Sequence, residues 1–229
     1  MRKQQEIWSE EHSKVDAFPS YVLPEPSSMV VAFVKFLKDH NINDGKIIDI
    51  GCGKGRNSIY LSEQGFQVYA VDYIQEAIDY AKHQVKDKNV QDSIIFINAA
   101  IDVPWQFENI FFDYAVDCFS SIDIETRDGR EIYKQEMYRT LKPGGFALVS
   151  VVSADDEIEA EMIKQSPGLE PNSTIWPSNG KFQKNYTESE LRRFYSEFEI
   201  VELKEIKKKS VKLNREFIAT NFRLILRKQ

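Results

Sequence analysis

A glycine-rich turn between an apolar segment and a helical one constrains this chain more than any other feature. Residues 46–50 (Lys-Ile-Ile-Asp-Ile) form a mostly apolar run, glycines follow at positions 51, 53 and 55, and a helix is predicted from Arg56 to Gln64. Open α/β folds use a strand, a glycine turn and a helix to bring the backbone against a nucleotide-like ligand. The dinucleotide fingerprint G-x-G-x-x-G would place its third glycine at position 56. This chain has it at Gly55, which argues against NAD.

A carboxylate ends the next apolar run at the spacing expected of a nucleotide-binding unit. Residues 67–71 are mostly apolar and lead to Asp72, close to the interval of about 20 residues at which such units place an acidic residue. A carboxylate at that strand end can accept hydrogen bonds from two ribose hydroxyls. No arginine follows it, so nothing indicates a 2′-phosphate. The alternative is a plain βαβ unit in which Asp72 caps the next helix.

Two further motifs follow in the same order along the chain. Residues 112–116 (Phe-Asp-Tyr-Ala-Val) match a fourth strand, and residues 141–145 (Leu-Lys-Pro-Gly-Gly) match the turn before a fifth. Together with the glycine turn and Val71-Asp72, they make residues 27–152 resemble the class I S-adenosylmethionine-dependent methyltransferases. Gly-Arg-Asn at positions 55–57 is similar to a bacterial branch of small-molecule enzymes that includes tellurite-resistance-type methyltransferases. The resemblance implies S-adenosylmethionine as the cofactor.

The resemblance also implies roles for particular residues. Those expected to bind the cofactor come from four strand ends: Asp49, Gly51, Cys52, Gly53, Arg56, Asp72, Tyr73, Ala100, Ile101, Asp117 and Cys118. Asp49 would bind the amino group of the methionine part, directly or through water, and Asp72 the ribose. Arg56 would pair with the carboxylate or else lie solvated on its helix, and Tyr73 would cover one adenine face. Ala99 stands where many relatives carry an Asp that accepts from the adenine amino group.

Methyl transfer from a sulfonium does not require a recognisable catalytic residue. The leaving group departs neutral, so the enzyme mainly holds a nucleophile in line with the S–CH₃ bond. A general base is needed only if the nucleophile arrives protonated. The three histidines, His12, His40 and His83, do not have metal-ligand spacing, so no metal is expected.

The remaining periodicity predicts one α/β domain over residues 1–229. Helices are predicted after Ser27-Ser28, over 75–85, over 130–141 and over 187–196, and strands over 94–97, 112–117 and 146–152. Segments 198–204 and 217–226 predict two late strands joined by a charged turn that holds the basic run 207–212. The expected fold is Rossmann-like: a seven-stranded, mostly parallel sheet with helices on both faces and an antiparallel last strand.

Two segments lie outside this pattern and are candidate lids. Residues 1–26 are expected to be irregular, and residues 154–186 form an insertion after the fifth strand, on the side of the sheet where ligands bind. The alternative is a surface excursion without a role. Aromatic side chains in both segments are either satellite packing or the wall of an acceptor pocket, and the candidates for substrate contact are Trp8, Tyr21, Trp176 and Tyr186.

Composition narrows the class of acceptor. The net charge of −6 and pI of about 5.3 disfavour a nucleic-acid substrate. No apolar run approaches the ~18 residues of a membrane span, the N-terminus is unlike a signal peptide, and two cysteines make no disulfide framework. We therefore expect a cytoplasmic enzyme that methylates a small-molecule nucleophile by in-line displacement. The alternatives are a protein or RNA acceptor, or a protein that binds the cofactor without catalysis; the sequence leaves the acceptor atom and the oligomeric state open.

Overall fold

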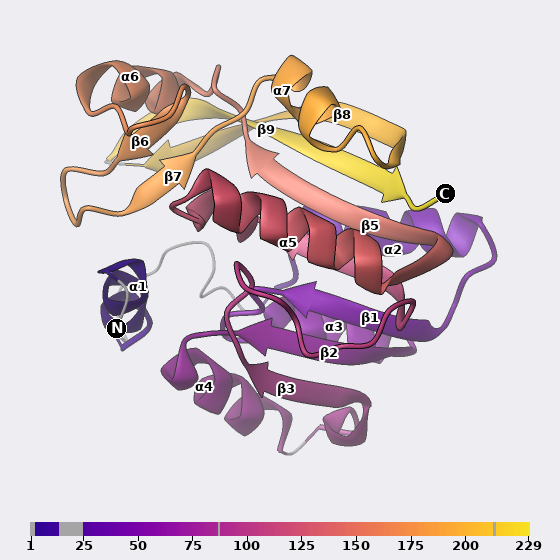
Figure 1. The fold of residues 1–229 in the computed structure, drawn as a ribbon. Helices are drawn as coiled ribbons and strands as arrows, with labels where there is room; N and C mark the ends of the chain where they lie inside the picture. Colours follow the sequence, from indigo (N-terminus) through magenta and orange to yellow (C-terminus); the bar gives the residue numbers. More distant parts are fainter. Residues whose placement is uncertain (1–2, 14–24, 87, 213) are drawn as a thin grey trace.

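A seven-stranded sheet forms the centre of the molecule (Figure 1). The computed structural model describes residues 3–13, 25–86, 88–212 and 214–229. The strand order is β3-β2-β1-β4-β5-β9-β8; the first five strands are parallel, whereas β9 is antiparallel to both β5 and β8. The strands are β1 (Gly45–Ile50), β2 (Phe66–Asp72), β3 (Ile94–Asn98), β4 (Phe112–Cys118), β5 (Leu141–Val152), β8 (Glu199–Lys212) and β9 (Arg215–Arg227). The predicted fold class is confirmed.

Helices cover both faces of this sheet. One face carries α2 (Ser28–Asp39), α3 (Arg56–Glu63) and α4 (Gln75–Val85), and the other carries α5 (Arg127–Thr140) and α7 (Glu188–Phe194). Neighbouring residues of one strand serve opposite cores: Ile47 packs with the α2 side and Ile48 with the α5 side. A strand buried on both faces needs a continuous apolar run rather than an alternating one, which explains the sequence of β1.

Local capping fixes where several helices begin. The Ser27 hydroxyl accepts a hydrogen bond from the Met29 amide (3.3 Å), and the predicted capping box of Thr187 and Glu190 is present. Helix α5 begins at Arg127 rather than at the predicted position 130, because the Thr126 hydroxyl accepts from the Gly129 amide at 3.0 Å. The helices are otherwise close to their predicted bounds.

Three expectations about irregular segments are wrong. Within the segment 1–26, helix α1 spans Lys3–Ser13, where the prolines further along had suggested irregular chain. The basic run 207–212 belongs to β8 and pairs with β9 as far as Lys212 and Arg215, instead of forming a turn. An edge strand tolerates lysines because its outer side faces solvent. Strand β5 begins at Leu141, which pairs with Phe112, rather than at position 146.

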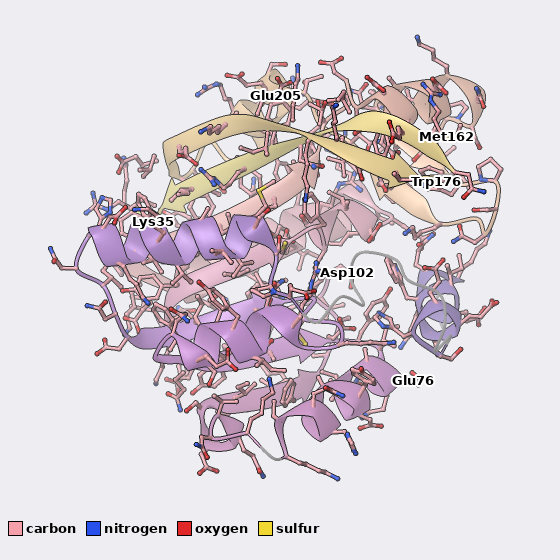
Figure 2. All side chains as sticks on the ribbon, turned by 180° about the vertical axis from the view of Figure 1, so that it is seen from behind. Lys35, Glu76, Asp102, Met162, Trp176 and Glu205 are labelled. Atoms are coloured by element: carbon pink, nitrogen blue, oxygen red, sulfur yellow. The ribbon has the colours of Figure 1, made fainter. Side chains whose placement is uncertain are left out.

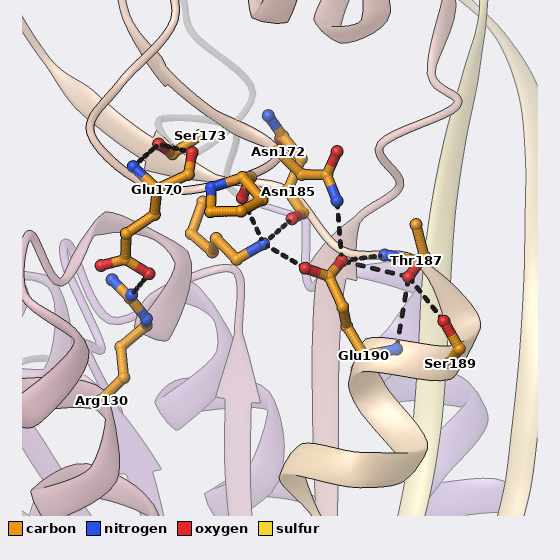
Figure 3. A network of polar contacts seen from close by, with 10 residues as sticks. Arg130, Glu170, Asn172, Ser173, Asn185, Thr187, Ser189 and Glu190 are labelled. Carbon is orange, nitrogen blue, oxygen red and sulfur yellow. Dashed lines mark hydrogen bonds and ion pairs between the residues drawn. The ribbon is translucent and has the colours of Figure 1, made fainter.

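The insertion 154–186 folds into helix α6 (Glu157–Gln165) and a small sheet of β6 (Ser173–Ile175) and β7 (Phe182–Lys184). A buried polar network attaches it to α5 and α7 (Figure 3). The Lys184 ammonium, 6% exposed, donates to the Pro171 carbonyl (2.9 Å) and pairs with Glu190 (3.0 Å), while Arg130 of α5 pairs with Glu170. Because these groups are bonded inside the protein, the insertion is a fixed part of the domain.

Among the residues that the structure describes, no helix is both long and apolar enough to span a bilayer.

Candidate functional site

The glycine turn lies where the strand order of the sheet reverses. Strand β1 has β2 on one side and β4 on the other, and such a switch point opens a crevice at the carboxyl ends of the strands. Gly51, Gly53 and Gly55 all have positive φ (68°, 53° and 82°), the left-handed region that favours glycine. The turn between β1 and α3 therefore needs glycine for its conformation at all three positions.

The three glycines differ in what a side chain would meet. A Cβ on Gly51 would lie 2.2 Å from the Ser120 hydroxyl, and one on Gly55 would lie 2.9 Å from the Ala81 Cβ of α4. These two glycines allow close packing of the chain. At Gly53 the nearest atom is the His12 Cε1, 3.6 Å away, so this backbone faces open space under α1. Gly53 is therefore the position at which a ligand can approach the bare backbone.

Asp72 connects the glycine turn to the start of α4. Its carboxylate accepts from the Gly53 amide (2.8 Å) with one oxygen and from the Ile74 amide (2.9 Å) with the other. Burial raises the pKa of Asp72, and the two amides act against that shift. A carboxylate oxygen has two lone pairs, so each can still accept a further hydrogen bond from a ligand.

A cavity of about 990 Å³ extends from this turn, at the upper end of the range of roughly 300–1,000 Å³ for small-molecule sites. Nine of the residues predicted to bind the cofactor line it: Gly51, Cys52, Gly53, Arg56, Asp72, Tyr73, Ala100, Ile101 and Cys118. Their positions are as the motif predicts, and their contacts with a cofactor stay a prediction. Burial raises the pKa of the Cys118 thiol to about 12, so it is protonated and unsuited to act as a nucleophile.

Two predicted residues, Asp49 and Asp117, are buried beneath the cavity and do not line it. Asp49 accepts from the Ser58 hydroxyl at 2.5 Å, and burial raises its pKa to about 6. Asp117 accepts from the Tyr133 hydroxyl (2.7 Å) and the Ser120 amide (2.8 Å), so it orders the loop after β4. The sequence motifs predict that both carboxylates contact the cofactor. In the structure both are buried and accept hydrogen bonds from other groups of the protein.

The four aromatic candidates for substrate contact separate in the structure. Trp8 lines the cavity, with the Lys181 ammonium 4.3 Å from its ring centroid. Tyr21 falls outside the described residues. Trp176 packs with Ile158 in a satellite cluster near Met162 (Figure 2), and Tyr186 belongs to the core beneath α7. Neither lines the cavity, because each finds apolar neighbours within the domain, so packing is the role that the structure gives them.

Several cavity residues had no signal in the motifs. They are polar and come from segments far apart in the sequence: Gln4 of α1, Asp102 after β3, Asp123 after β4, Glu159 of α6 and Lys181 before β7. Asp102 follows Ala99 by three residues, so a carboxylate is present near the position at which relatives carry an Asp. Only that one could have been suspected from sequence spacing.

Helix α1 lies between α4 and the insertion (Figure 1), and Gln4, Trp8 and His12 of this helix line the cavity. On the α4 side, the Gln5 amide donates to the Tyr73 carbonyl (3.1 Å) and the Ser9 hydroxyl to Glu76 (2.9 Å). On the insertion side, the Asn179 amide donates to Glu11 at 2.8 Å. Hydrogen bonds to α4 on one side and to the insertion on the other therefore hold the helix over the space that Gly53 faces.

His12 is enclosed by this arrangement. Burial, followed by the charge of Lys54, lowers its pKa to about 4, against smaller opposing effects of Glu11 and Glu76. The imidazole is therefore neutral when α1 is in place.

Comparison with known proteins finds that this chain is similar to methyltransferases. Residues 47–145 match the family described as "Methyltransferase domain". The chain is 32% identical over 111 residues to the putative methyltransferase YqeM of Bacillus subtilis, covering 48% of this chain and 43% of that protein. It is 26% identical over 167 residues to the probable S-adenosyl-L-methionine-dependent methyltransferase TehB of Haemophilus influenzae, covering 72% and 49%. The chain thus spans about half the length of these relatives.

Solved structures share the fold. A SAM-dependent methyltransferase from Methanosarcina mazei superposes with a TM-score of 0.72 at 22% identity, covering 83% of this chain and 96% of that one. The 1,6-didemethyltoxoflavin-N1-methyltransferase of Burkholderia thailandensis, solved with its substrate and S-adenosylhomocysteine, gives 0.65 at 18% identity, covering 88% and 79%. These findings confirm the resemblance to the class I S-adenosylmethionine-dependent methyltransferases, including its tellurite-resistance-type branch.

Proposed function

We propose that this chain binds S-adenosylmethionine at the glycine turn and transfers its methyl group to a small molecule. The proposal depends on one observation. Gly53, Asp72 and Tyr73 line the same cavity as a second set of polar residues beyond the strand ends, namely Gln4, Asp102, Asp123, Glu159 and Lys181. Space for a cofactor and an acceptor side by side is what an in-line transfer needs.

The residues present fit that cofactor. The backbone of Gly53 is open toward the cavity, and Asp72 keeps lone pairs for ribose hydroxyls while its other bonds hold it still. Tyr73 and Ile101, which line the cavity, would enclose the adenine, and Asp102 would accept from its amino group. Arg56 would pair with the methionine carboxylate. When bound, the cofactor supplies an activated methyl group on a positively charged sulfur.

The protein's own contribution is orientation and exclusion of water. Helix α1 and the insertion 154–186 would act as covers, because they meet over the cavity through Asn179 and Glu11. A small acceptor is supported by the cavity's size and by the small-molecule substrate of the Burkholderia relative. The net charge of −6 weighs against nucleic acid.

Thermal unfolding with candidate cofactors tests the proposal. A ligand at ~100 times its dissociation constant stabilises the folded protein by about 2.7 kcal/mol, which raises Tm by roughly 5–10 °C at ~2–4 °C per kcal/mol. We expect this rise with S-adenosylmethionine and S-adenosylhomocysteine, and none with NAD or NADP. A rise with NAD alone would refute the proposal. A rise with S-adenosylhomocysteine but no homocysteine release in a broad acceptor screen would favour a non-catalytic binder or a macromolecular acceptor.

A further inference from the structure

The charge of the cavity wall is strongly acidic over the residues that the structure describes. Seven carboxyl side chains line it, against one arginine, one lysine and one histidine: Asp72, Asp102, Asp123, Glu125, Asp128, Asp156 and Glu159 against Arg56, Lys181 and His12. Asp72 ends β2 and Asp102 follows β3. Of the other five, Asp123, Glu125 and Asp128 follow β4, and Asp156 and Glu159 follow β5. In a partly enclosed cavity this excess favours a cationic ligand and repels an anionic one.

The Asp123 Oδ1 and the Gln4 Oε1, both from residues of this wall, are buried acceptor atoms with no hydrogen-bond partner among the described residues. Gln4 is 4% exposed, and its Nε2 donates to the Glu125 carboxylate (3.5 Å) and the Gly180 carbonyl (3.4 Å). Both of those partners are acceptors, so they fix which end of the amide is nitrogen and leave its oxygen as an acceptor.

A buried acceptor without a partner lowers the stability of the folded protein, so its presence in a cavity wall points to a donor on a ligand. Because Asp123 and Gln4 both lack a donor, the missing group carries N–H or O–H bonds. Because the wall is acidic, it favours a donor group that is positively charged. An ammonium group meets both conditions, with up to three donors and one positive charge.

We propose that the acceptor is a small amine with an apolar body, bound as its ammonium form against Asp123 and Gln4, and that Asp123 removes its proton before attack. The proposal rests on the proposed function and names its substrate class. Apolar walls for the body of the amine come from Trp8, Phe119 and Phe217, which line the same cavity.

The proposed reaction is balanced in protons and electrons. The ammonium N–H bond breaks and its proton passes to the Asp123 carboxylate, which leaves a lone pair on nitrogen. That pair forms the N–C bond to the methyl group, while the C–S bond breaks and its electrons stay on sulfur. The products are a methylated ammonium and a neutral thioether, and the proton on Asp123 leaves to solvent.

The surroundings of Asp123 suit a proton acceptor near neutral pH. Burial raises its pKa to about 7, the charges of Asp117, Glu11 and Glu159 add to the shift, and Lys181 opposes it. A base with a pKa close to the working pH combines a useful deprotonated fraction with a strong pull on the proton. The value of kcat/KM, which reports the free enzyme, should therefore rise with pH through about 7 and level off above it.

The test compares matched ligands in the S-adenosylhomocysteine-loaded protein by calorimetry. Phenethylamine and 3-phenylpropanoate form one pair with an aryl body, and n-butylamine and butyrate form a second pair with an alkyl body. We expect each amine to bind at least 10-fold more tightly than its carboxylate counterpart. A carboxylate that binds as well as its amine, or the failure of both amines to bind, would overturn the proposal. Loading with S-adenosylhomocysteine is measured first, so failure of the proposed function is seen separately.

Variants test the named residues. Asp123→Asn and Gln4→Leu should each weaken amine binding at least 10-fold while leaving S-adenosylhomocysteine affinity within 2-fold. Asp92→Asn removes the same charge at an exposed site outside the cavity and should change neither. With S-adenosylmethionine, the wild type should lose activity below pH 7, and Asp123→Asn should show no such step. Unchanged amine affinity in a folded Asp123→Asn protein, checked by its Tm, would show that Asp123 has no part in the site.

Discussion

Replacing Asp72 by alanine should weaken both the glycine turn and cofactor binding, to different extents. The change removes two charged hydrogen bonds, to the amides of Gly53 and Ile74, each worth ~1.5–3 kcal/mol. Burial raises the pKa of this carboxyl despite both bonds, which means that desolvation offsets much of their value. We therefore expect a net loss of stability of about 1–3 kcal/mol, a fall in Tm of roughly 2–12 °C at ~2–4 °C per kcal/mol.

The loss in cofactor affinity should be larger. Two ribose hydroxyls would each lose a charged acceptor, about 3 kcal/mol together at the lower limit of ~1.5 kcal/mol each, or more than 100-fold in Kd for S-adenosylhomocysteine. Isothermal calorimetry measures Kd, and thermal unfolding measures Tm of the unliganded variant. Asp79→Ala, an equal charge change at an exposed site of α4, should alter neither. A folded Asp72→Ala protein with wild-type affinity would refute the role of this residue.

Three further outcomes are expected. Removal of residues 1–26 should leave a folded protein that binds S-adenosylhomocysteine but transfers methyl at least ~10-fold more slowly, about 1.4 kcal/mol in the barrier; full activity would show that α1 is packing alone. When α1 is docked, the pKa of His12 is about 4, whereas the ordinary value for histidine is 6.5. Docked α1 therefore binds fewer protons than undocked α1. Its docking should weaken as pH falls below 6.5, by ~10-fold at pH 5.5; hydrogen exchange in α1, with α2 as the internal control, measures this, and His12→Gln should abolish the dependence. Tyr133→Phe removes the 2.7 Å bond to buried Asp117 and should lower stability by ~1–3 kcal/mol; an unchanged Tm would contradict that value.

The part of the cavity around the glycine turn could be predicted from sequence because its signals are local. The glycines, the strand before them and the helix after them lie within 20 residues of one another, and each element forms for reasons visible in its own residues. Asp72 adds one further strand end at a fixed interval. Strand ends of a parallel sheet meet at one edge, so the motif spacing also placed Ala100 and Cys118 there.

The part of the cavity that we propose for the acceptor could not be predicted in this way. Gln4, Asp123 and Glu159 come from three segments separated by long stretches of chain, and only the folded insertion and α1 bring them together. Helix α1 itself is polar, with Gln4 its buried residue, so it lacks the apolar stripe by which α2 was found. The lysines of β8 suggested a turn because a run of charged residues is typical of one. The strand instead continues to Lys212, which pairs with Arg215.

We propose that S-adenosylmethionine binds at the switch point, with its ribose on Asp72 and its methionine part over Gly53. A crystal structure of the protein with S-adenosylhomocysteine tests this binding mode most directly. We predict both ribose hydroxyls within hydrogen-bonding distance, about 2.5–3.0 Å, of the Asp72 carboxylate, and the methionine part beneath α1. Density for the ligand elsewhere on the protein, or a ribose without contact to Asp72, would contradict it.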